Sequence, residues 1–431
     1  MKVFDEAVKG VGERAFLLGR SQGDDAEAVE REMEELDELA RTAGAVVVGS
    51  DTQSRPKPDP ALLFGRGKVA EIRALRQTLE FGLVIVNEEL SPRQQRNLEE
   101  ALGVPIVDRT GLILDIFAQH ARSREGRVQV EVAQLRHLLP RLAGAERLSR
   151  MGGGIGMRGP GEQKLETDRR RIRVRLRGLE KDLKQLQEER SLRREARRRL
   201  PFRTVALVGY TNAGKSTLLN ALTSGGARAE DKLFATLDPT TRALKLPDRQ
   251  PCLAIDTVGF IQKLPHELVA AFGATLEEVT QADLLVHVLD ASHAGAELRL
   301  ETVHRTLREL GLEDRPMVVA INKIDLCSPE SRARLATFQP SPYVGAELVS
   351  AKRGAGLDRL RRLIGQALSR EMLPAEATIS YDNWAALDRW RRYGVVDEEQ
   401  FQADGIHVRG RLPPPLAEAL RGRTPEEASS A

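Results

Sequence analysis

The stretch that decides the fold is Thr204-Val-Ala-Leu-Val-Gly-Tyr-Thr-Asn-Ala-Gly-Lys-Ser-Thr-Leu-Leu-Asn-Ala-Leu222. Its apolar start at 204–208 predicts a strand and its end at 217–222 predicts a helix, with Gly-x-x-x-x-Gly-Lys-Ser between them. In this setting, backbone N–H groups and the positive end of the helix surround nucleotide phosphates. We expect Lys215 to reach the β- and γ-phosphates and the Ser216 hydroxyl to bind Mg²⁺.

A second phosphate motif, Asp256-Thr-Val-Gly259, follows the apolar segment 253–255. The aspartate is expected to hold Mg²⁺, directly or through water, and the Gly259 N–H to sense the γ-phosphate. In Ras-like switches a glutamine follows this motif and orients the attacking water, whereas this chain has Phe260. We therefore expect slow hydrolysis until another group positions the water.

The motif Asn322-Lys-Ile-Asp325 identifies the base and follows the predicted strand 316–321. A carboxylate at Asp325 can accept hydrogen bonds from the ring N–H and amine of guanine, and adenine offers no such pair. Asn322 is expected to brace the loops, Lys323 to cover the base, and 350–352 (Ser-Ala-Lys) to offer a backbone N–H to the guanine carbonyl. Together the motifs predict a P-loop GTPase domain with a doubly wound, mostly parallel sheet over residues 200–372.

Two ligand assignments stay open at this point. The polar segment Phe234-Ala-Thr-Leu-Asp-Pro-Thr-Thr-Arg242 should form the first switch, but spacing alone leaves Thr236, Thr240 and Thr241 as candidates for Mg²⁺. Asn212 is a candidate K⁺ ligand, as in several GTPases that lack the catalytic glutamine. Such an ion would offset phosphate charge in the transition state. The alternative is that Asn212 only braces its loop by hydrogen bonds.

Composition excludes several other classes of protein. The chain has 431 residues, 41% apolar and 30% charged, which indicates several soluble domains. No run approaches a membrane span, the first twenty residues do not form a signal peptide, and no His/Cys cluster suggests a metal-related GTPase. The two cysteines, Cys252 and Cys327, lie far apart and fit a reduced, cytoplasmic protein. We also expect a monomer.

The rest of the chain divides by its periodicity. Residues 1–22 show no clear period and are expected to be a tail. Residues 23–122 alternate helical and strand patterns and predict a small α/β domain, with strands near 45–49 (expected to be buried), 83–87 and 105–108. Residues 123–199 carry two long helical patterns, the second with a heptad seam, and predict an antiparallel hairpin. Residues 373–431 are expected to be a short C-terminal domain or tail.

The hairpin carries two features that indicate RNA. Its connecting segment 151–161 has six glycines in eleven residues, and a thin basic tip of this kind can enter a narrow, negatively charged cavity. The alternative is a plain linker. Residues 166–200 hold fourteen Arg/Lys against seven Asp/Glu, which is a footprint for nucleic acid or a solvated helix face. The candidate RNA contacts are Arg147, Arg150, Arg158, Arg169, Arg170 and Arg171.

Four segments outside the nucleotide motifs resemble the HflX family of translation-factor-like GTPases. They are Leu63-Phe-Gly-Arg-Gly-Lys-Val69, Asp108-Arg-Thr-Gly-Leu-Ile-Leu114, Val130-Glu-Val-Ala-Gln-Leu135, and 153–170 from the glycine-rich tip into the second helix. The resemblance covers roughly residues 40–370. It implies an N-terminal α/β domain and a hairpin whose loop reaches the peptidyl-transferase region. It also implies ribosome-stimulated GTP hydrolysis and dissociation of stalled ribosomes after heat stress. The family pattern Phe-Ala-Thr-Leu-Asp falls on 234–238 and selects Thr236 for Mg²⁺.

The resulting predictions are these. The partners are GTP or GDP and the large ribosomal subunit with its RNA, and the alternative function is a GTPase of large-subunit assembly. The expected catalytic residues are Lys215, Thr236 and Gly259, and the expected Mg²⁺ ligands are Ser216 and Thr236. The expected nucleotide contacts are Gly209, Tyr210, Thr211, Asn212, Ala213, Gly214, Lys215, Ser216, Phe234, Ala235, Thr236, Leu237, Asp238, Asp256, Thr257, Val258, Gly259, Asn322, Lys323, Ile324, Asp325, Ser350, Ala351 and Lys352.

Overall fold

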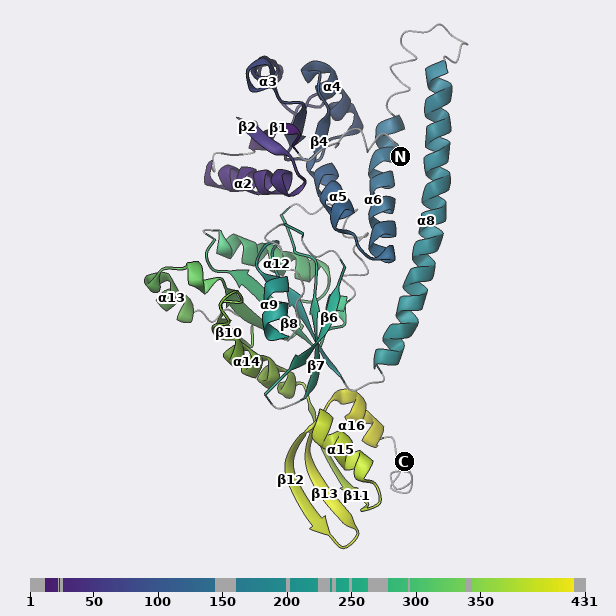
Figure 1. The fold of residues 1–431 in the computed structure, drawn as a ribbon, viewed down its shortest axis with the longest axis vertical. Coiled ribbons are helices and arrows are strands. Elements are labelled where there is room, and N and C mark those ends of the chain that lie inside the picture. The colour runs from purple at the N-terminus through teal and green to yellow at the C-terminus, as the bar shows by residue number, and fades with distance from the viewer. Residues whose placement is uncertain are drawn as a thin grey trace. The chain divides into compact units, whose positions relative to one another are not determined.

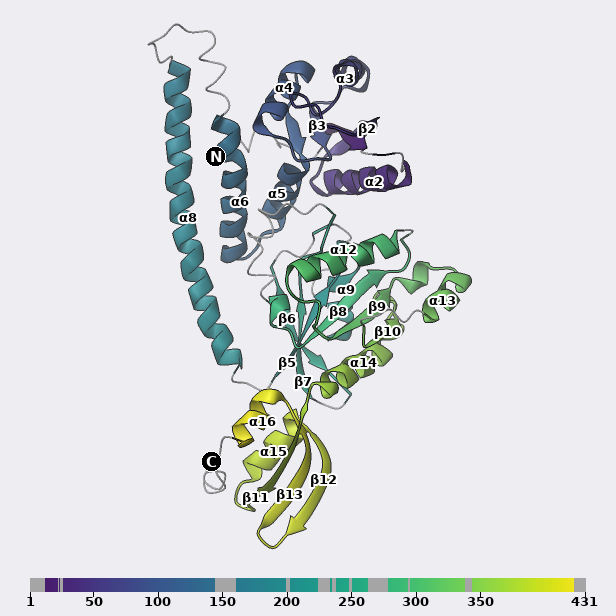
Figure 2. The same ribbon diagram turned by 180° about the vertical axis from the view of Figure 1, so that it is seen from behind.

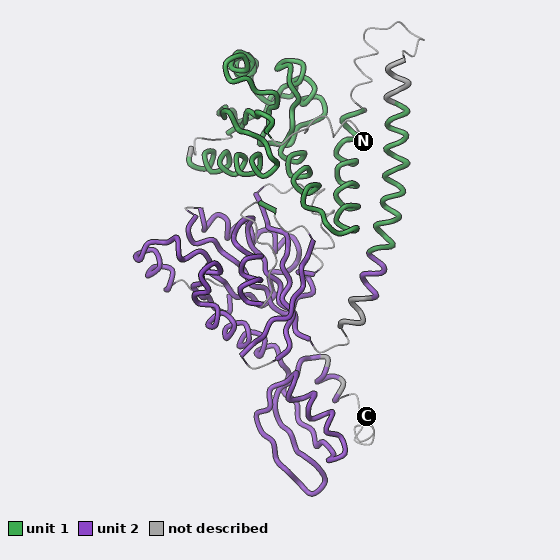
Figure 3. The backbone as a smooth tube through the Cα atoms, viewed as in Figure 1, with its two compact units in different colours: residues 1–186, 232–234, 263–272 green, residues 187–231, 235–262, 273–431 purple. Residues whose placement is uncertain are grey.

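The computed structural model describes residues 12–21, 23, 26–143, 160–198, 202–223, 233–234, 238–247, 250–262, 278–293, 295–337 and 343–421. It forms two compact units, which are drawn in different colours in Figure 3. The first comprises residues 1–186 with 232–234 and 263–272, and the second comprises the remainder. None of the helices in the described part of the chain is long and apolar enough to cross a membrane.

The first unit contains a four-stranded parallel sheet in the order β2-β1-β3-β4. The strands are β1 (Arg14–Ser21), β2 (Val46–Ser54), β3 (Leu83–Val86) and β4 (Ile106–Asp108). The expectation that residues 1–22 form a tail is wrong for β1, which is a central strand with Phe16 and Leu18 in the core. Both faces of this strand are covered, so its sequence shows no alternation of apolar and polar residues. The α/β domain therefore begins before residue 23.

Helices cover both faces of this sheet, as Figures 1 and 2 show. Helix α2 (Ala26–Thr42) packs beside α5 (Arg109–His120), and α3 (Arg66–Leu79) packs beside α4 (Pro92–Leu102). The expectation of a buried strand at 45–49 is wrong, because β2 is an edge strand and Val46 keeps 47% of its surface exposed. An edge strand has a neighbouring strand on one side only, which leaves its apolar side chains partly in water.

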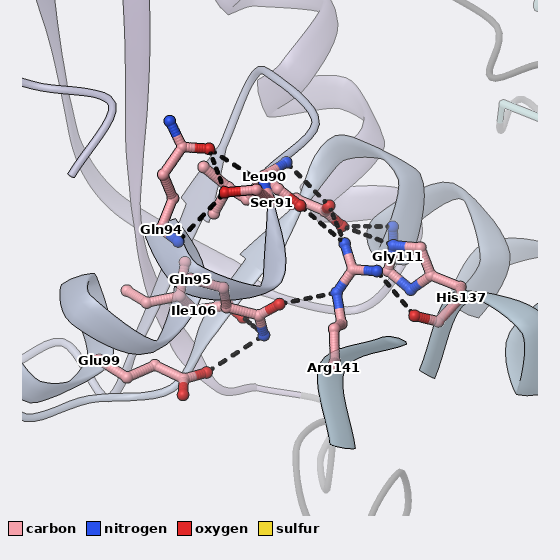
Figure 4. A network of polar contacts seen from close by, with 10 residues as sticks. Leu90, Ser91, Gln94, Gln95, Glu99, Ile106, Gly111, His137 and Arg141 are labelled. Atoms are coloured by element: carbon pink, nitrogen blue, oxygen red, sulfur yellow. Dashed lines mark hydrogen bonds and ion pairs between the residues drawn. The ribbon is translucent and has the colours of Figure 1, made fainter. Parts of the chain in front are cut away.

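Asp108 joins two helices of this domain and the loop before α4, and its partners Leu90, Gly111 and Arg141 are labelled in Figure 4. Its carboxylate caps α5 through the Gly111 N–H at 2.9 Å and also accepts from the Leu90 N–H at 3.2 Å. Arg141, on helix α6 (Arg124–Ala143), donates to the same carboxylate at 2.6 Å. Burial alone would raise the pKa of Asp108, but the neighbouring His137 and Arg141 hold it below its ordinary value. This buried ion pair ties α6 to the sheet.

Helices α6 and α8 (Pro160–Arg198) run antiparallel, as Figures 1 and 2 show. Two ion pairs cross between them, Arg175 to Glu131 at 2.8 Å and Arg136 to Glu180 at 2.7 Å. Leu179 of the predicted seam is buried. The glycine-rich tip at 151–161 and the arginines 147, 150 and 158 lie outside the described residues, except for the helical backbone of 160–161.

The second unit contains a six-stranded sheet in the order β10-β9-β8-β5-β7-β6. The strands are β5 (Arg203–Val208), β6 (Thr240–Lys245), β7 (Pro251–Asp256), β8 (Leu284–Asp290), β9 (Met317–Asn322) and β10 (Gly345–Leu348). Strand β6 runs antiparallel to β7, and the other described pairs are parallel. Helices α9 (Lys215–Leu222) and α14 (Leu357–Arg370) share one core, whereas α12 (Ala296–Glu309) and α13 (Pro329–Ala336) pack on the other face. The predicted doubly wound GTPase fold is confirmed.

Residues 373–421 form a small folded layer at the yellow end of the chain in Figure 1. Strands β11 (Leu373–Ile379), β12 (Val395–Gln402) and β13 (Gly405–Leu412) make an antiparallel sheet in the order β11-β13-β12. Helices α15 (Trp384–Tyr393) and α16 (Pro414–Arg421) cover it. Leu387, Trp390 and Val408 belong to its own apolar core, so this stretch is more than an unstructured tail.

Candidate nucleotide-binding site

The nucleotide motifs meet at one edge of the six-stranded sheet. Strands β5, β7 and β9 lie within four neighbouring positions and end, respectively, at the P-loop, Asp256 and Asn322. Because these strands are parallel, their carboxyl ends share one edge, where ligands of open α/β sheets bind. The topology thus assembles motifs that are more than a hundred residues apart in the chain.

The P-loop has the backbone that a phosphate cradle needs. Gly209 adopts a φ of 150°, and a side chain there would collide with the Val288 carbonyl. Gly214 adopts a φ of 91° and is the N-cap residue of α9. The Lys215 Nζ donates to the carbonyls of Gly209 at 3.2 Å and Tyr210 at 2.9 Å, so the ammonium lies inside the loop. Burial lowers the pKa of Lys215 to about 8.

Two oxygen ligands suited to Mg²⁺ lie in direct contact. The Ser216 hydroxyl donates to Oδ2 of Asp256 at 2.6 Å, and the Thr257 hydroxyl fixes the end of β7 by donating to the Leu207 carbonyl at 2.6 Å. A hydroxyl and a carboxylate are ligands that Mg²⁺ accepts, so the donor set fits this ion. Thr236, with Ala235 and Leu237, lies outside the described residues.

Phe260, directly after Gly259, forms an isolated parallel β-bridge with Tyr210 of the P-loop. The Phe260 N–H donates to the Gly209 carbonyl at 3.0 Å, and the Thr211 N–H donates to the Phe260 carbonyl at 2.8 Å. A Cβ added at Gly259 would come within 2.7 Å of the Thr211 Cα, so this approach requires glycine. Phe260 is buried.

Tyr210 strengthens this junction, and the sequence had assigned it no specific role. Its hydroxyl accepts a hydrogen bond from the Gln262 N–H at 3.0 Å, and the Arg299 guanidinium lies 4.7 Å from its ring centroid. The cation–π contact connects the P-loop to α12. The spacing of these three residues along the chain carries no signal that could have revealed the contact.

Thr211 is the second unanticipated feature of the loop. Its hydroxyl oxygen is buried and forms no hydrogen bond with any residue that the structure describes. An unsatisfied buried hydroxyl costs about 1–3 kcal/mol. The group therefore marks a place where a ligand oxygen or a water molecule would be stabilised, next to Gly259.

The base-reading motifs are braced against the P-loop. The Asn322 amide donates to the Ala213 carbonyl at 2.9 Å, and its oxygen accepts from the Ala351 N–H at 3.0 Å. Asp325 accepts from the Ser350 hydroxyl at 2.6 Å, and this bond lowers the pKa of the carboxylate. The Lys323 ammonium pairs with Asp290 at 2.9 Å. These contacts hold a carboxylate where guanine would be read.

Other predicted residues lie apart from this cluster. The Phe234 ring packs edge-on against Phe117 of α5, with centroids 4.6 Å apart, so its side chain belongs to an apolar contact. On α8, Arg169 lies 3.5 Å from Glu166 and Arg171 lies 3.5 Å from Asp168. These are surface ion pairs, which stabilise little. Asn212 has a left-handed φ of 57°, and no described residue forms a hydrogen bond with its side-chain amide.

The chain is similar to known proteins along most of its length. Three family models match the chain: GTP-binding GTPase N-terminal over residues 30–118, GTP-binding GTPase Middle Region over 120–197, and 50S ribosome-binding GTPase over 204–323. A crystal structure of SsGBP with GDP aligns with 83% of this chain and 99% of its own, at 26% identity and a TM-score of 0.47.

Curated relatives match nearly the whole length. GTPase HflX of Caldanaerobacter subterraneus is 47% identical over 95% of this chain and 93% of its own. GTPase HflX of Escherichia coli is 40% identical over 89% of this chain and 90% of its own. The chain belongs to the HflX family of GTP-hydrolysing enzymes.

Proposed function

We propose that this GTPase binds the large ribosomal subunit, hydrolyses GTP faster when bound there, and dissociates stalled ribosomes. The observation that carries the proposal is the match of residues 204–323, which contain most of the assembled nucleotide site, to a family described as 50S ribosome-binding GTPase. The basic block on α8 gives further support, because phosphate contacts supply most of the affinity for nucleic acid.

The connection between the basic helix and the nucleotide site is short. Four residues separate the end of α8 at Arg198 from the start of β5 at Arg203, and β5 leads into the P-loop. In the proposed mechanism, a force that the ribosome exerts on α8 is transmitted through β5 to the P-loop, which holds the phosphates. The tip at 151–161 enters the ribosome, and the arginines at 147, 150, 158, 169, 170 and 171 contact its RNA.

Hydrolysis uses the residues already described. Lys215 and the Gly259 N–H hold the β- and γ-phosphates, while Ser216, Asp256 and, we propose, Thr236 hold Mg²⁺. When bound, Mg²⁺ would supply positive charge that offsets the charge developing on the phosphates. Asn212 would hold K⁺ through its side-chain amide oxygen, and this amide forms no hydrogen bond with a described residue. Phe260 cannot orient the attacking water. Hydrolysis therefore stays slow until ribosome binding supplies a group that does.

Sedimentation of whole ribosomes tests the proposal. With GTP and this protein, free subunits should accumulate. A variant lacking residues 152–161 should bind nucleotide normally but release no subunits. A large-subunit assembly GTPase would leave whole ribosomes intact. Normal subunit release by the deletion variant would remove the tip from the mechanism.

A further inference from the structure

We propose that a basic groove in the GTPase domain, formed by α9, β6 and α14, binds the phosphate backbone of RNA. The groove has a volume of about 1050 Å³, and its floor includes Leu222, Leu246 and Pro247. Arg242 ends the segment expected to form the first switch, and the other described lining residues lie outside the nucleotide motifs. The proposal rests on the ribosome binding proposed above and adds a second RNA contact to that of α8.

Cations outnumber carboxylates among the described residues that line the groove. Arg242 and Lys245 on β6 and Arg362 on α14 line it, and none forms an ion pair with a described residue. Asp358 also lines it, but its carboxylate is already paired with Arg361 at 2.7 Å. Arg242, Lys245 and Arg362 thus line one groove without an ion-pair partner among the described residues.

Arg361 connects two of the helices that form the groove. Besides its pair with Asp358, it donates to the carbonyls of Ala221 at 3.1 Å and Leu222 at 3.2 Å. These carbonyls belong to the last turn of α9, where cations are favoured by the helix dipole. Arg361 therefore joins α14 to α9 and holds two walls of the groove together, while the three unpaired cations remain available.

A chain of phosphates fits this arrangement better than a small anion. Sites for small ligands usually enclose about 300–1,000 Å³ and bury most of the ligand. Here the hollow lies at the upper end of that range. Its cations come from a strand and a helix, and spaced cations can neutralise successive phosphates. The apolar floor suits the faces of riboses and bases.

An alternative role for these cations is to protect the edge of the sheet, but this role does not account for all three of them. Cations such as Arg242 and Lys245 on an edge strand discourage pairing with another chain. Arg362 lies on helix α14, where no strand edge needs protection. The two arginines also present guanidinium groups, whose planar donors match phosphate oxygens.

The test compares two triple variants of the full chain. Arg242→Gln/Lys245→Gln/Arg362→Gln removes the groove charges, and Arg305→Gln/Arg334→Gln/Arg389→Gln removes three exposed cations elsewhere in the second unit. The probes are a fluorescent RNA hairpin and isolated large ribosomal subunits, each titrated across a series of salt concentrations. GDP affinity is measured for every variant to show that the nucleotide domain is folded.

The groove variant should bind the hairpin at least about tenfold more weakly at low salt, and its salt slope should fall by about two to three. The control variant should match the wild type. The proposal is overturned if the groove variant keeps wild-type affinity and slope, or if the control variant loses as much. It is also overturned if the groove variant keeps its affinity for RNA but loses affinity for an acidic polyglutamate peptide. That result would indicate a protein partner.

The two probes separate this proposal from the proposed function. Groove-dependent hairpin binding without any binding of large subunits would support the groove and contradict ribosome binding. Binding of both probes that does not depend on the groove charges would contradict the groove and leave ribosome binding intact.

Discussion

The Ser350 hydroxyl donates a hydrogen bond of 2.6 Å to Oδ1 of Asp325 and so orients the carboxylate that faces the expected guanine site. Ser350 follows β10 and Asp325 follows β9, and these two strands are neighbours in the sheet. A base reader fixed from a second strand needs little rearrangement when nucleotide binds.

Asp325→Asn should change the preferred base from guanine to xanthine, because an amide can donate to the carbonyl that xanthine has in place of the guanine amine. Ser350→Ala is the matched control. It should weaken GTP binding roughly fivefold, the loss of about one hydrogen bond, without changing base preference. Competition between GTP and XTP measures both effects, and an unchanged GTP preference in Asp325→Asn would show that another residue reads the base.

Asn212→Ala should remove a dependence on potassium. Wild-type turnover, stimulated by large subunits, should be several-fold faster in K⁺ than in Na⁺ at equal ionic strength, and the variant should be slow in both. Equal wild-type rates in the two salts would exclude the cation and leave the ribosome as the source of the missing charge.

Thr211→Val should slow hydrolysis about tenfold while GDP affinity stays unchanged. The side chain keeps its shape but loses the buried hydroxyl that the structure leaves without a described partner beside Gly259. Single-turnover hydrolysis measures the effect, and Thr211→Ser, which keeps the hydroxyl, should restore most of the rate. A valine variant as fast as wild type would give this hydroxyl a purely structural role.

Asp115→Asn should stabilise the protein at alkaline pH. Asp115 lies on α5 with Glu13 beside a small cavity, and burial raises its pKa to about 7. His137 and a hydrogen bond from Gln134 oppose this shift, whereas Asp108 adds to it. Because the folded pKa exceeds the unfolded value of 3.8, stability is present at low pH and is lost as the pH rises through about 7.

Calorimetry between pH 5 and pH 8 measures this effect. The Asn variant should gain more than about 1 kcal/mol over wild type at pH 8 and less at pH 5. Asp314→Asn, at an exposed position of the second unit, is the control. An equal change at both pH values would show that charge on Asp115 is not the cause.

Local patterns in the sequence predicted the P-loop, Asp256 and Asn322, which the sheet brings to one edge, whereas the role of Thr236 stays a prediction. The P-loop was predictable because strand, glycine loop and helix follow one another over 204–222, and the other motifs each end a strand. Strand β1 was missed because burial on both faces erases its period. The Asp108–Arg141 ion pair and the groove at Arg242 and Arg362 were not predictable, because each joins segments far apart in the chain.

Light scattering of whole ribosomes with an orthogonal nucleotide is the most direct test of GTP-driven dissociation. Wild type with GTP and Asp325→Asn with XTP should both lower the scattering as subunits separate. Wild type with XTP and Asp325→Asn with GTP should leave it unchanged. Dissociation that proceeds equally in all four mixtures, or in none, would contradict the proposal that nucleotide held by Asp325 drives this protein to split ribosomes.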